Sequence, residues 1–177
     1  MTYEQIWAPW RLTYVQGDKS EPAPSRPLTF LSGADSECFL CQNVAATWDC
    51  EPDRERGVVR RRSSSIVVLN RYPYNNGHLL VAPCRHVGRL DELTPDEEIE
   101  LTRTITKMVG LLEKVLHPHG FNIGLNLGQS AGAGLPGHLH WHIVPRWNGD
   151  TNFMPILANV NVIPQSLDAL WDALTNA

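Results

Sequence analysis

Short runs of apolar and β-branched residues alternate with turn-forming sequences in the middle of the chain. Val58-Val59 and Ile66–Leu69 are separated by arginines and serines, so they predict a β-hairpin. The turn sequence Tyr72–Gly77 comes next, and His78–Pro83 predicts a third strand. This part of the chain therefore predicts antiparallel strands joined by short connections.

A long amphipathic helix is predicted after the third strand. Thr94 is a good N-cap, Pro95 suits the first helical position, and Glu97 stands where a capping-box acid can reach back to the cap. Pro118 ends the pattern. Apolar residues recur at spacings of three and four, and we expect them in the core: Ile105, Met108, Val109, Leu112, Val115 and Leu116.

Two more strands and a last helix complete the predicted elements. Phe121–Leu127 and His138–Val144 predict strands, and a helix is expected near Gln165–Leu174. Hairpins around one long helix indicate an α+β domain with a mainly antiparallel sheet of about five strands and a C-terminal helix. Residues 1–35 contain Trp7 and Trp10 but follow no steady period, so we expect an arm packed on a single domain of residues 36–177 that ends in a tail.

Composition and charge restrict the class of protein. The 177 residues contain 15 Lys+Arg and 19 Asp+Glu, a net charge of −4, which argues against binding to nucleic acid or to a membrane surface. No apolar run approaches the ~20 residues of a membrane span, and the first residues do not resemble a signal peptide. We therefore expect a cytoplasmic protein, in which the four cysteines are thiols or metal ligands rather than disulfides.

Three histidines at alternate positions are the strongest chemical signal. On a strand, His138, His140 and His142 would share one face at ~6.6 Å intervals, and the apolar residues between them would face the core. A row of imidazoles is costly to bury for packing alone, because each ring has two nitrogens that need partners. The pattern therefore predicts a functional site.

Two chemistries compete for this row of histidines. The imidazoles could bind a metal ion that activates water, or one neutral imidazole could be a nucleophile that forms a covalent intermediate. The loop just before the row favours the nucleophile. Its small residues, 131–134, allow backbone N–H groups to approach a phosphate closely.

The sequence from about Cys38 to Trp147 resembles the histidine triad (HIT) nucleotide hydrolases and transferases. His138–Val144 has their His-φ-His-φ-His-φ-φ signature, and Leu69–Val81 is similar to their asparagine strand and Pro-Gly-His turn. Within this family, Trp7–Arg11, Phe121–Gly128 and Pro145–Trp147 most resemble bacterial diadenosine tetraphosphate phosphorylases. The resemblance implies a HIT-like fold and a homodimer or higher homo-oligomer.

The resemblance also implies a nucleotidyl-transfer site without an organic cofactor. His140 would attack the α-phosphorus of diadenosine tetraphosphate and carry a nucleotidyl group, and His142 would contact the phosphate oxygens. The acceptor would be inorganic phosphate. One alternative is a hydrolase of dinucleoside polyphosphates or adenosine phosphoramidates, in which the acceptor is water. Another is a nucleotide-binding signalling protein. The remaining substrate-binding residues implied by the resemblance are Asn70, Asn126, Gln129, Ser130, Gly132 and Gly134.

One position departs from the family pattern. The family usually has a hydroxyl or amide side chain four residues before the first histidine, where this chain has Gly134. Gln129 or Ser130 could supply the missing donor from earlier in the loop. This departure bears on leaving-group preference and rate, and does not affect the assignment of the nucleophile.

The pair Cys38 and Cys41 is the second chemical signal. A CxxC pair can be redox-active or half of a zinc site, and no thioredoxin-like βαβ pattern surrounds this one. The resemblance implies a structural zinc ion bound by this pair with His86 and His138, although two buried thiols remain the alternative. Cys50 and Cys84 are expected to have no ligand role.

Overall fold

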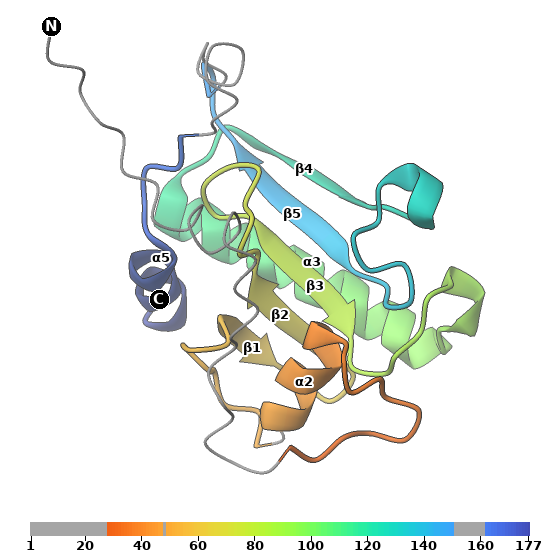
Figure 1. The fold of residues 1–177 in the computed structure, drawn as a ribbon. Coiled ribbons are helices and arrows are strands. Elements are labelled where there is room, and N and C mark those ends of the chain that lie inside the picture. Colours follow the sequence, from red (N-terminus) through yellow and green to blue (C-terminus); the bar gives the residue numbers. More distant parts are fainter. Residues whose placement is uncertain (1–27, 48, 151–161) are drawn as a thin grey trace, which may run out of the picture.

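The fold of the computed structural model, which describes residues 28–47, 49–150 and 162–177, is built on one five-stranded antiparallel sheet (Figure 1). The strand order is β1-β2-β3-β5-β4, so β1 and β4 are the two edges of the sheet. The sequence predicted this fold class correctly. The strands are β1 (Val58–Arg61), β2 (Ser65–Leu69), β3 (Leu79–Pro83), β4 (Gly120–Leu125) and β5 (Trp141–Arg146).

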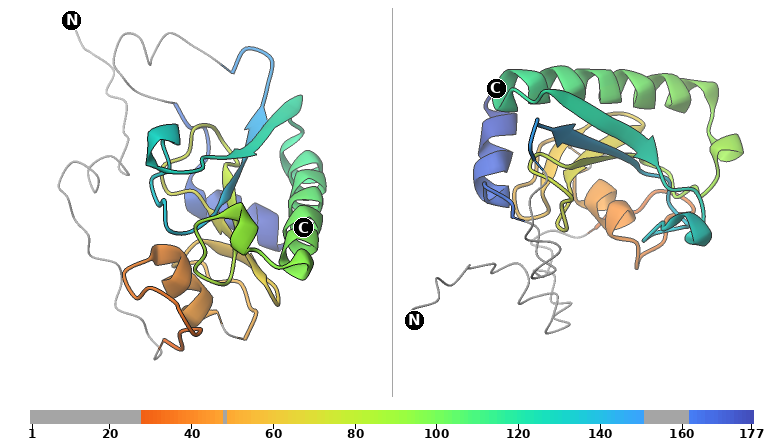
Figure 2. Two further views of the ribbon diagram at one scale, coloured as in Figure 1. Left: turned by 90° about the vertical axis from the view of Figure 1, so that its right-hand side faces the viewer. Right: turned by 90° about the horizontal axis from the view of Figure 1, so that it is seen from above.

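Helices cover the two faces of the sheet unequally. The long helix α3 (Pro95–Leu116) and the C-terminal helix α5 (Leu167–Thr175) lie on one face, and the short helix α2 (Phe39–Ala46) lies against part of the other (Figure 2). None of the described helices is long and apolar enough to cross a membrane. Among the described elements, the face that carries α2 is therefore the less covered one.

Strands β2 and β3 are buried on both faces, and their alternating side chains form two cores. Val67 and Val81 pack with Leu101 and Met108 of α3, whereas Ile66, Val68, Leu80 and Ala82 pack with Leu40 and Val44 of α2. Because both faces of these strands are buried, their sequences are continuous apolar runs. The two cores also fix the register of the strands.

The predicted elements differ from the observed ones mainly at their ends. Strand β1 continues through Arg60 and Arg61, which the sequence had suggested for the turn, and α5 is displaced slightly from its predicted range. Helix α2 was not predicted, because its eight residues are too few to show a periodic pattern. Most of the predicted N-terminal arm lies outside the described residues, so the boundary between residues 35 and 36 stays a prediction.

The turn before β3 requires a glycine. Gly77 has φ of +77°, and a Cβ atom there would lie 2.6 Å from Cδ1 of Leu116. The tight packing of this turn against the end of α3 sets the position of the next residue, His78, which the candidate site uses.

The capping box predicted for α3 is present. The backbone N–H of Glu97 donates to Oγ1 of Thr94, and the Glu97 carboxylate accepts from the backbone N–H of Thr94. We expect Thr94→Ala to lower the free energy of unfolding by about 1 kcal/mol, because it leaves a backbone donor unsatisfied. Urea denaturation measures this change.

Thr102→Ala is a matched control for the cap, because Thr102 lies in the same helix and its hydroxyl only bonds back to the Glu98 carbonyl. Alanine favours a helix interior, so this variant should be unchanged or slightly more stable. Equal destabilisation of both variants would contradict the capping role of Thr94.

Candidate active site

The three histidines of the triad occupy two environments. Only His142 lies within β5; His138 and His140 precede it, so the prediction of one strand through all three was wrong at its beginning. The physical reason is that β3 pairs with β5 only from Trp141 onward, while the backbone N–H of Leu139 donates to the carbonyl of Val87 instead.

His140 and His142 line a cavity of about 500 Å³ on the α2 side of the sheet. Their ring centroids are 5.1 Å apart. Of the predicted substrate-binding residues, Asn70, Asn126, Gly132 and Gly134 line the same cavity. Gln129 and Ser130 lie in the short 3-10 helix Gln129–Ala131, are exposed, and are not among the lining residues.

Several lining residues were not predicted. Phe39 and Asn43 reach the cavity from the unpredicted helix α2, and Tyr72 and Tyr74 come from the turn that precedes β3, where Arg71 also lines the cavity. The turn sequence itself was recognised, but nothing in it indicated which side chains face a cavity. The walls therefore combine aromatic, amide and cationic groups around the two histidines.

The hydrogen bond of His140 fixes which nitrogen faces the cavity. Nδ1 of His140 lies 2.8 Å from the carbonyl oxygen of His138. A carbonyl only accepts, so Nδ1 carries the hydrogen and donates it. In the neutral ring, Nε2 then has a free lone pair, which is the form of imidazole that acts as a nucleophile.

His142 is held in the opposite tautomer through His78. The backbone N–H of Tyr74 donates to Nδ1 of His78 over 3.1 Å, so the hydrogen of the neutral His78 ring is on Nε2. This Nε2 lies 2.9 Å from Nδ1 of His142 and donates to it. His142 must therefore carry its own hydrogen on Nε2, a buried atom with no hydrogen-bond partner among the described residues.

Burial keeps these two rings neutral. It lowers the pKa of His78 to about 3, with a further contribution from the nearby His142 and His140. Burial, and then the proximity of His140, also lower the pKa of His142. Near neutral pH, the pair thus presents one N–H donor to the cavity instead of two positive charges.

The depressed pKa of His78 predicts a loss of stability in acid. The unfolded chain takes up a proton on this residue below its usual pKa near 6.5, whereas the folded protein resists protonation until about pH 3. The contribution of neutral His78 to the free energy of unfolding is therefore fully present above pH 6.5 and is lost as the pH falls toward 3. Between pH 7 and pH 4.5, wild type should lose about 2 kcal/mol more unfolding free energy than His78→Gln.

Denaturant titrations at several pH values test this difference. His119→Gln, which removes a histidine from an exposed position, is the matched control and should behave as wild type. An unchanged pH dependence in His78→Gln would show that burial does not suppress protonation of His78.

The remaining triad histidine, His138, belongs to a different cluster. Nδ1 of His138 lies 3.3 Å from Sγ of Cys38 and 3.6 Å from Sγ of Cys41, and the Cys41 sulfur lies 3.3 Å from Nδ1 of His86. One ligand atom from each of these four residues lies within 4.8 Å of the others. The cluster joins the start of α2 to the loop after β3 and to the triad.

The donor set of this cluster fits a tetrahedral metal ion. Zinc bonds to sulfur and nitrogen imply S···N separations of about 3.5 Å in a tetrahedron, close to the observed ones. Nε2 of His138 is 2.9 Å from the Pro83 carbonyl and donates to it, which leaves Nδ1 free as a ligand. Burial raises the pKa of the Cys38 thiol to about 12, so a thiolate there needs a cation beside it. The predicted ligands are thus brought together and can bind a metal ion.

Comparison with known proteins assigns the class. The sequence model of the HIT domain family matches residues 52–149, and the chain belongs to this family. It is 39% identical over 170 residues to a Mycobacterium tuberculosis protein named AP-4-A phosphorylase, which covers 93% of this chain and 78% of that protein. A Schizosaccharomyces pombe protein named bis(5'-nucleosyl)-tetraphosphatase (asymmetrical) is 40% identical over 93 residues, 52% of this chain and 50% of that protein.

Solved structures agree on the fold. The Caenorhabditis elegans NitFhit protein superposes with a TM-score of 0.57 at 30% identity, covering 68% of this chain and 27% of that chain. A zinc-bound histidine triad family protein from Mycobacterium smegmatis gives a TM-score of 0.61 at 23% identity, covering 79% and 91%. The resemblance found in the sequence is therefore confirmed at the level of family and fold.

Proposed function

We propose that this HIT protein cleaves diadenosine tetraphosphate and related dinucleoside polyphosphates by nucleotidyl transfer through His140, with inorganic phosphate as the acceptor. The observation that carries the proposal is the complementary pair of tautomers at the cavity. One ring offers an Nε2 lone pair and its neighbour offers an unpartnered Nε2–H. A nucleophile beside an N–H donor suits attack on a phosphorus whose oxygens gain negative charge.

The proposed reaction has two steps. In the first, Nε2 of His140 forms a bond to the α-phosphorus, the bond from phosphorus to the bridging oxygen breaks, and ATP leaves. In the second, an oxygen of inorganic phosphate attacks the nucleotidyl-histidine, which releases ADP and restores neutral His140. Water in place of phosphate would release AMP.

The cavity residues support this assignment of roles. His142 donates to the non-bridging phosphate oxygens, and the amides of Asn70 and Asn126, which line the same cavity, bind ribose and phosphate. The backbone N–H of Tyr72 donates to Oδ1 of Asn70 over 2.9 Å, which holds that amide in one orientation. Gly132 and Gly134 let the loop backbone approach the phosphates, and Gln129 and Ser130 are the weaker members of the predicted set because they are not among the residues that line the cavity.

A metal hydrolase centred on the triad is less well supported. His138 is the one triad residue in the Cys-His cluster, and the Nδ1 atoms of His140 and His142 are both engaged in hydrogen bonds. The same cluster supports a structural zinc ion held by Cys38, Cys41, His86 and His138, which would supply folding energy and no reaction step. The proposal includes no organic cofactor.

Two further expectations belong to the proposal. The homodimer is supported by the exposed edge strand β4, where Ile123 remains 47% exposed. A cytoplasmic location is supported by cysteine ligands, which must stay reduced to bind a metal ion. The homodimer is tested by light scattering, which measures the molar mass of the Ile123→Glu variant. A charge on this strand should give a monomer.

Product analysis tests the proposed reaction. Diadenosine tetraphosphate is incubated with the protein, with and without inorganic phosphate, and the nucleotides are separated. We expect repeated turnover, with ADP and ATP in equal amounts, only when phosphate is present; without phosphate, at most one ATP per active site is released. AMP and ATP without phosphate would identify a hydrolase, and no turnover with either acceptor would refute this substrate.

A further inference from the structure

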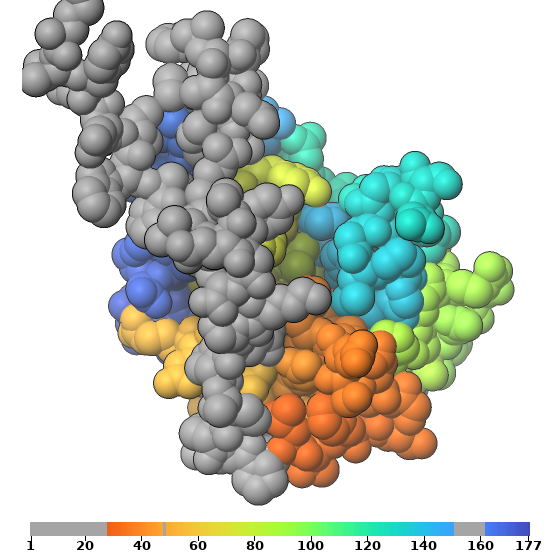
Figure 3. Space-filling model, in the orientation of Figure 1, coloured from red at the N-terminus to blue at the C-terminus, as the bar shows by residue number. Residues whose placement is uncertain are grey.

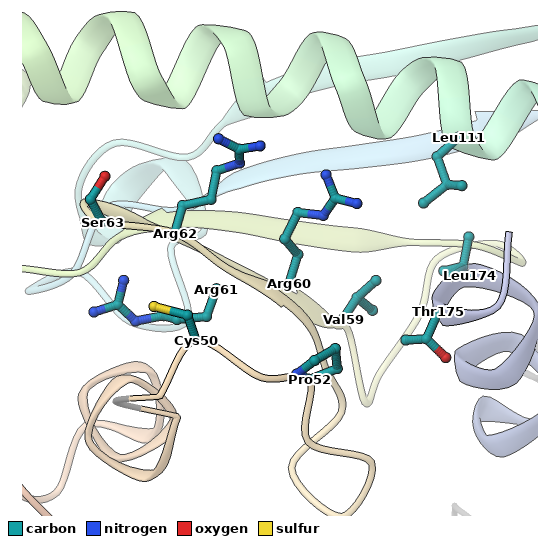
Figure 4. A pocket seen from close by; sticks show the side chains of 10 residues that line it. All are labelled: Cys50, Pro52, Val59, Arg60, Arg61, Arg62, Ser63, Leu111, Leu174 and Thr175. Carbon is teal, nitrogen blue, oxygen red and sulfur yellow. The ribbon is translucent and has the colours of Figure 1, made fainter.

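A second cavity, of about 470 Å³, follows the outer edge of β1 (Figure 4). It shares no lining residue with the cavity of His140 and His142. Figure 3 shows the cyan loop that borders the histidine cavity on the opposite side of this face from the blue helix α5, whose Leu174 and Thr175 line the second cavity. Since the two cavities are separate, the nucleotidyl-transfer site does not account for this one.

Three consecutive arginines line this cavity. Arg60 and Arg62 extend toward α3, and Arg61 points to the other side of the strand, next to Cys50 (Figure 4). This alternation is that of a strand, and β1 can display both sides because it is an edge of the sheet. The cavity therefore presents guanidinium groups on both sides of one strand.

An adjoining cavity of about 250 Å³ extends the cationic surface along α3. Arg62 lines both cavities, and Arg103 and Lys107 line the second with Asp96 and Glu100. Glu100 is already hydrogen-bonded to Ser63, Ser64 and Ser65, and among the described residues neither it nor Asp96 forms an ion pair with these cations. Five cations and two acids leave a local excess of positive charge in a chain whose net charge is −4.

Three guanidinium nitrogens of the arginines that line this cavity have no acceptor. Nε and Nη1 of Arg61 and Nε of Arg62 are buried without a hydrogen-bond partner among the described residues. A buried, unsatisfied cationic donor is costly, and guanidinium groups bind phosphate oxygens through two parallel hydrogen bonds. Anionic oxygens of a ligand would supply acceptors for these nitrogens.

We propose that the edge of β1 is a second anion site, which binds a chain of phosphates along Arg61, Arg60 and Arg62 toward Arg103 and Lys107. A chain is favoured over a single phosphate because these cations line two adjoining cavities. The chain could come from inorganic polyphosphate or from a nucleoside polyphosphate, for which Val59, Leu111 and Leu174 offer an apolar surface to a base.

Alkylation of Cys50 by neutral iodoacetamide tests the site locally. Cys50 is exposed in this cavity, whereas the other three cysteines are buried, and peptide mass spectrometry reads its modification separately. Tripolyphosphate at ten times its dissociation constant should slow the alkylation about tenfold, because it leaves about one site in eleven free. Sulfate at equal ionic strength should give little protection.

Two variants and a second ligand complete the experiment. Arg60→Gln/Arg62→Gln should lose the protection by tripolyphosphate, whereas Arg89→Gln, which removes an exposed arginine paired with Asp91 elsewhere, should keep it. Stronger protection by ATP than by tripolyphosphate would identify a nucleotide as the source of the chain, and equal protection would identify the phosphates alone. Absence of protection in wild type, or equal protection in the double variant, would overturn the proposal.

Discussion

Replacing His140 with asparagine is expected to reduce turnover of diadenosine tetraphosphate by about 10⁴-fold or more, with nucleotide binding retained. In the wild type, the His138 carbonyl accepts from Nδ1 of His140, and an asparagine amide can still donate to it. Asparagine has no lone pair able to attack phosphorus. The variant should therefore fold and bind as wild type does. Turnover and binding are measured separately, by product analysis and by calorimetry.

His119→Asn is the matched control for His140→Asn. It makes the same substitution at an exposed position whose ring accepts only from the backbone N–H of Asn148, and it should keep full activity. Substantial turnover by His140→Asn would mean that another group attacks phosphorus, and the proposed covalent step would then be wrong.

Loss of the metal ligands is expected to have the second large effect. Cys41→Ala should purify without zinc and lose more than about 3 kcal/mol of unfolding free energy, since structural zinc sites supply much larger apparent binding energies. Activity should fall with it, because His138 is both a member of the Cys-His cluster and the carbonyl partner of His140. Elemental analysis measures the metal, and thermal denaturation with and without a chelator measures the stability.

Cys84→Ala provides the control for metal binding. Cys84 is also buried, and burial likewise raises the pKa of its thiol, to about 11, but it lies outside the cluster. This variant should keep one zinc ion per chain and a chelator-sensitive stability. A Cys41→Ala protein as stable as Cys84→Ala, with no zinc in wild type, would support two plain buried thiols at positions 38 and 41.

The sequence was most informative where a local pattern decides the structure. The capping box of Thr94 and Glu97 and the apolar spacing along α3 depend on neighbours in the chain, and both are observed. The β1–β2 hairpin was visible for the same reason. The triad motif was specific enough to assign the family, and the four ligand residues predicted from that resemblance come together in space.

Long-range contacts could not be predicted from the sequence. His78 was noticed only as the first residue of a predicted strand and as part of the family's turn, because its role depends on a hydrogen bond to His142, 64 residues away. Phe39 and Asn43 were missed because they reach the cavity from a helix that local periodicity did not predict. The division of the triad between a cavity and a ligand cluster depends on where β5 begins to pair, and alternation along the chain does not encode that point.

The most direct test of the account is to identify the atom that carries the nucleotide. Wild type is mixed with diadenosine tetraphosphate without inorganic phosphate, the reaction is stopped rapidly, and peptides are analysed by mass spectrometry under conditions that preserve phosphorus–nitrogen bonds. The account predicts one adenylyl group on His140, which disappears with formation of ADP when phosphate is added before the stop. An adenylyl group on another residue, or steady turnover with no covalent adduct at any time, would contradict it.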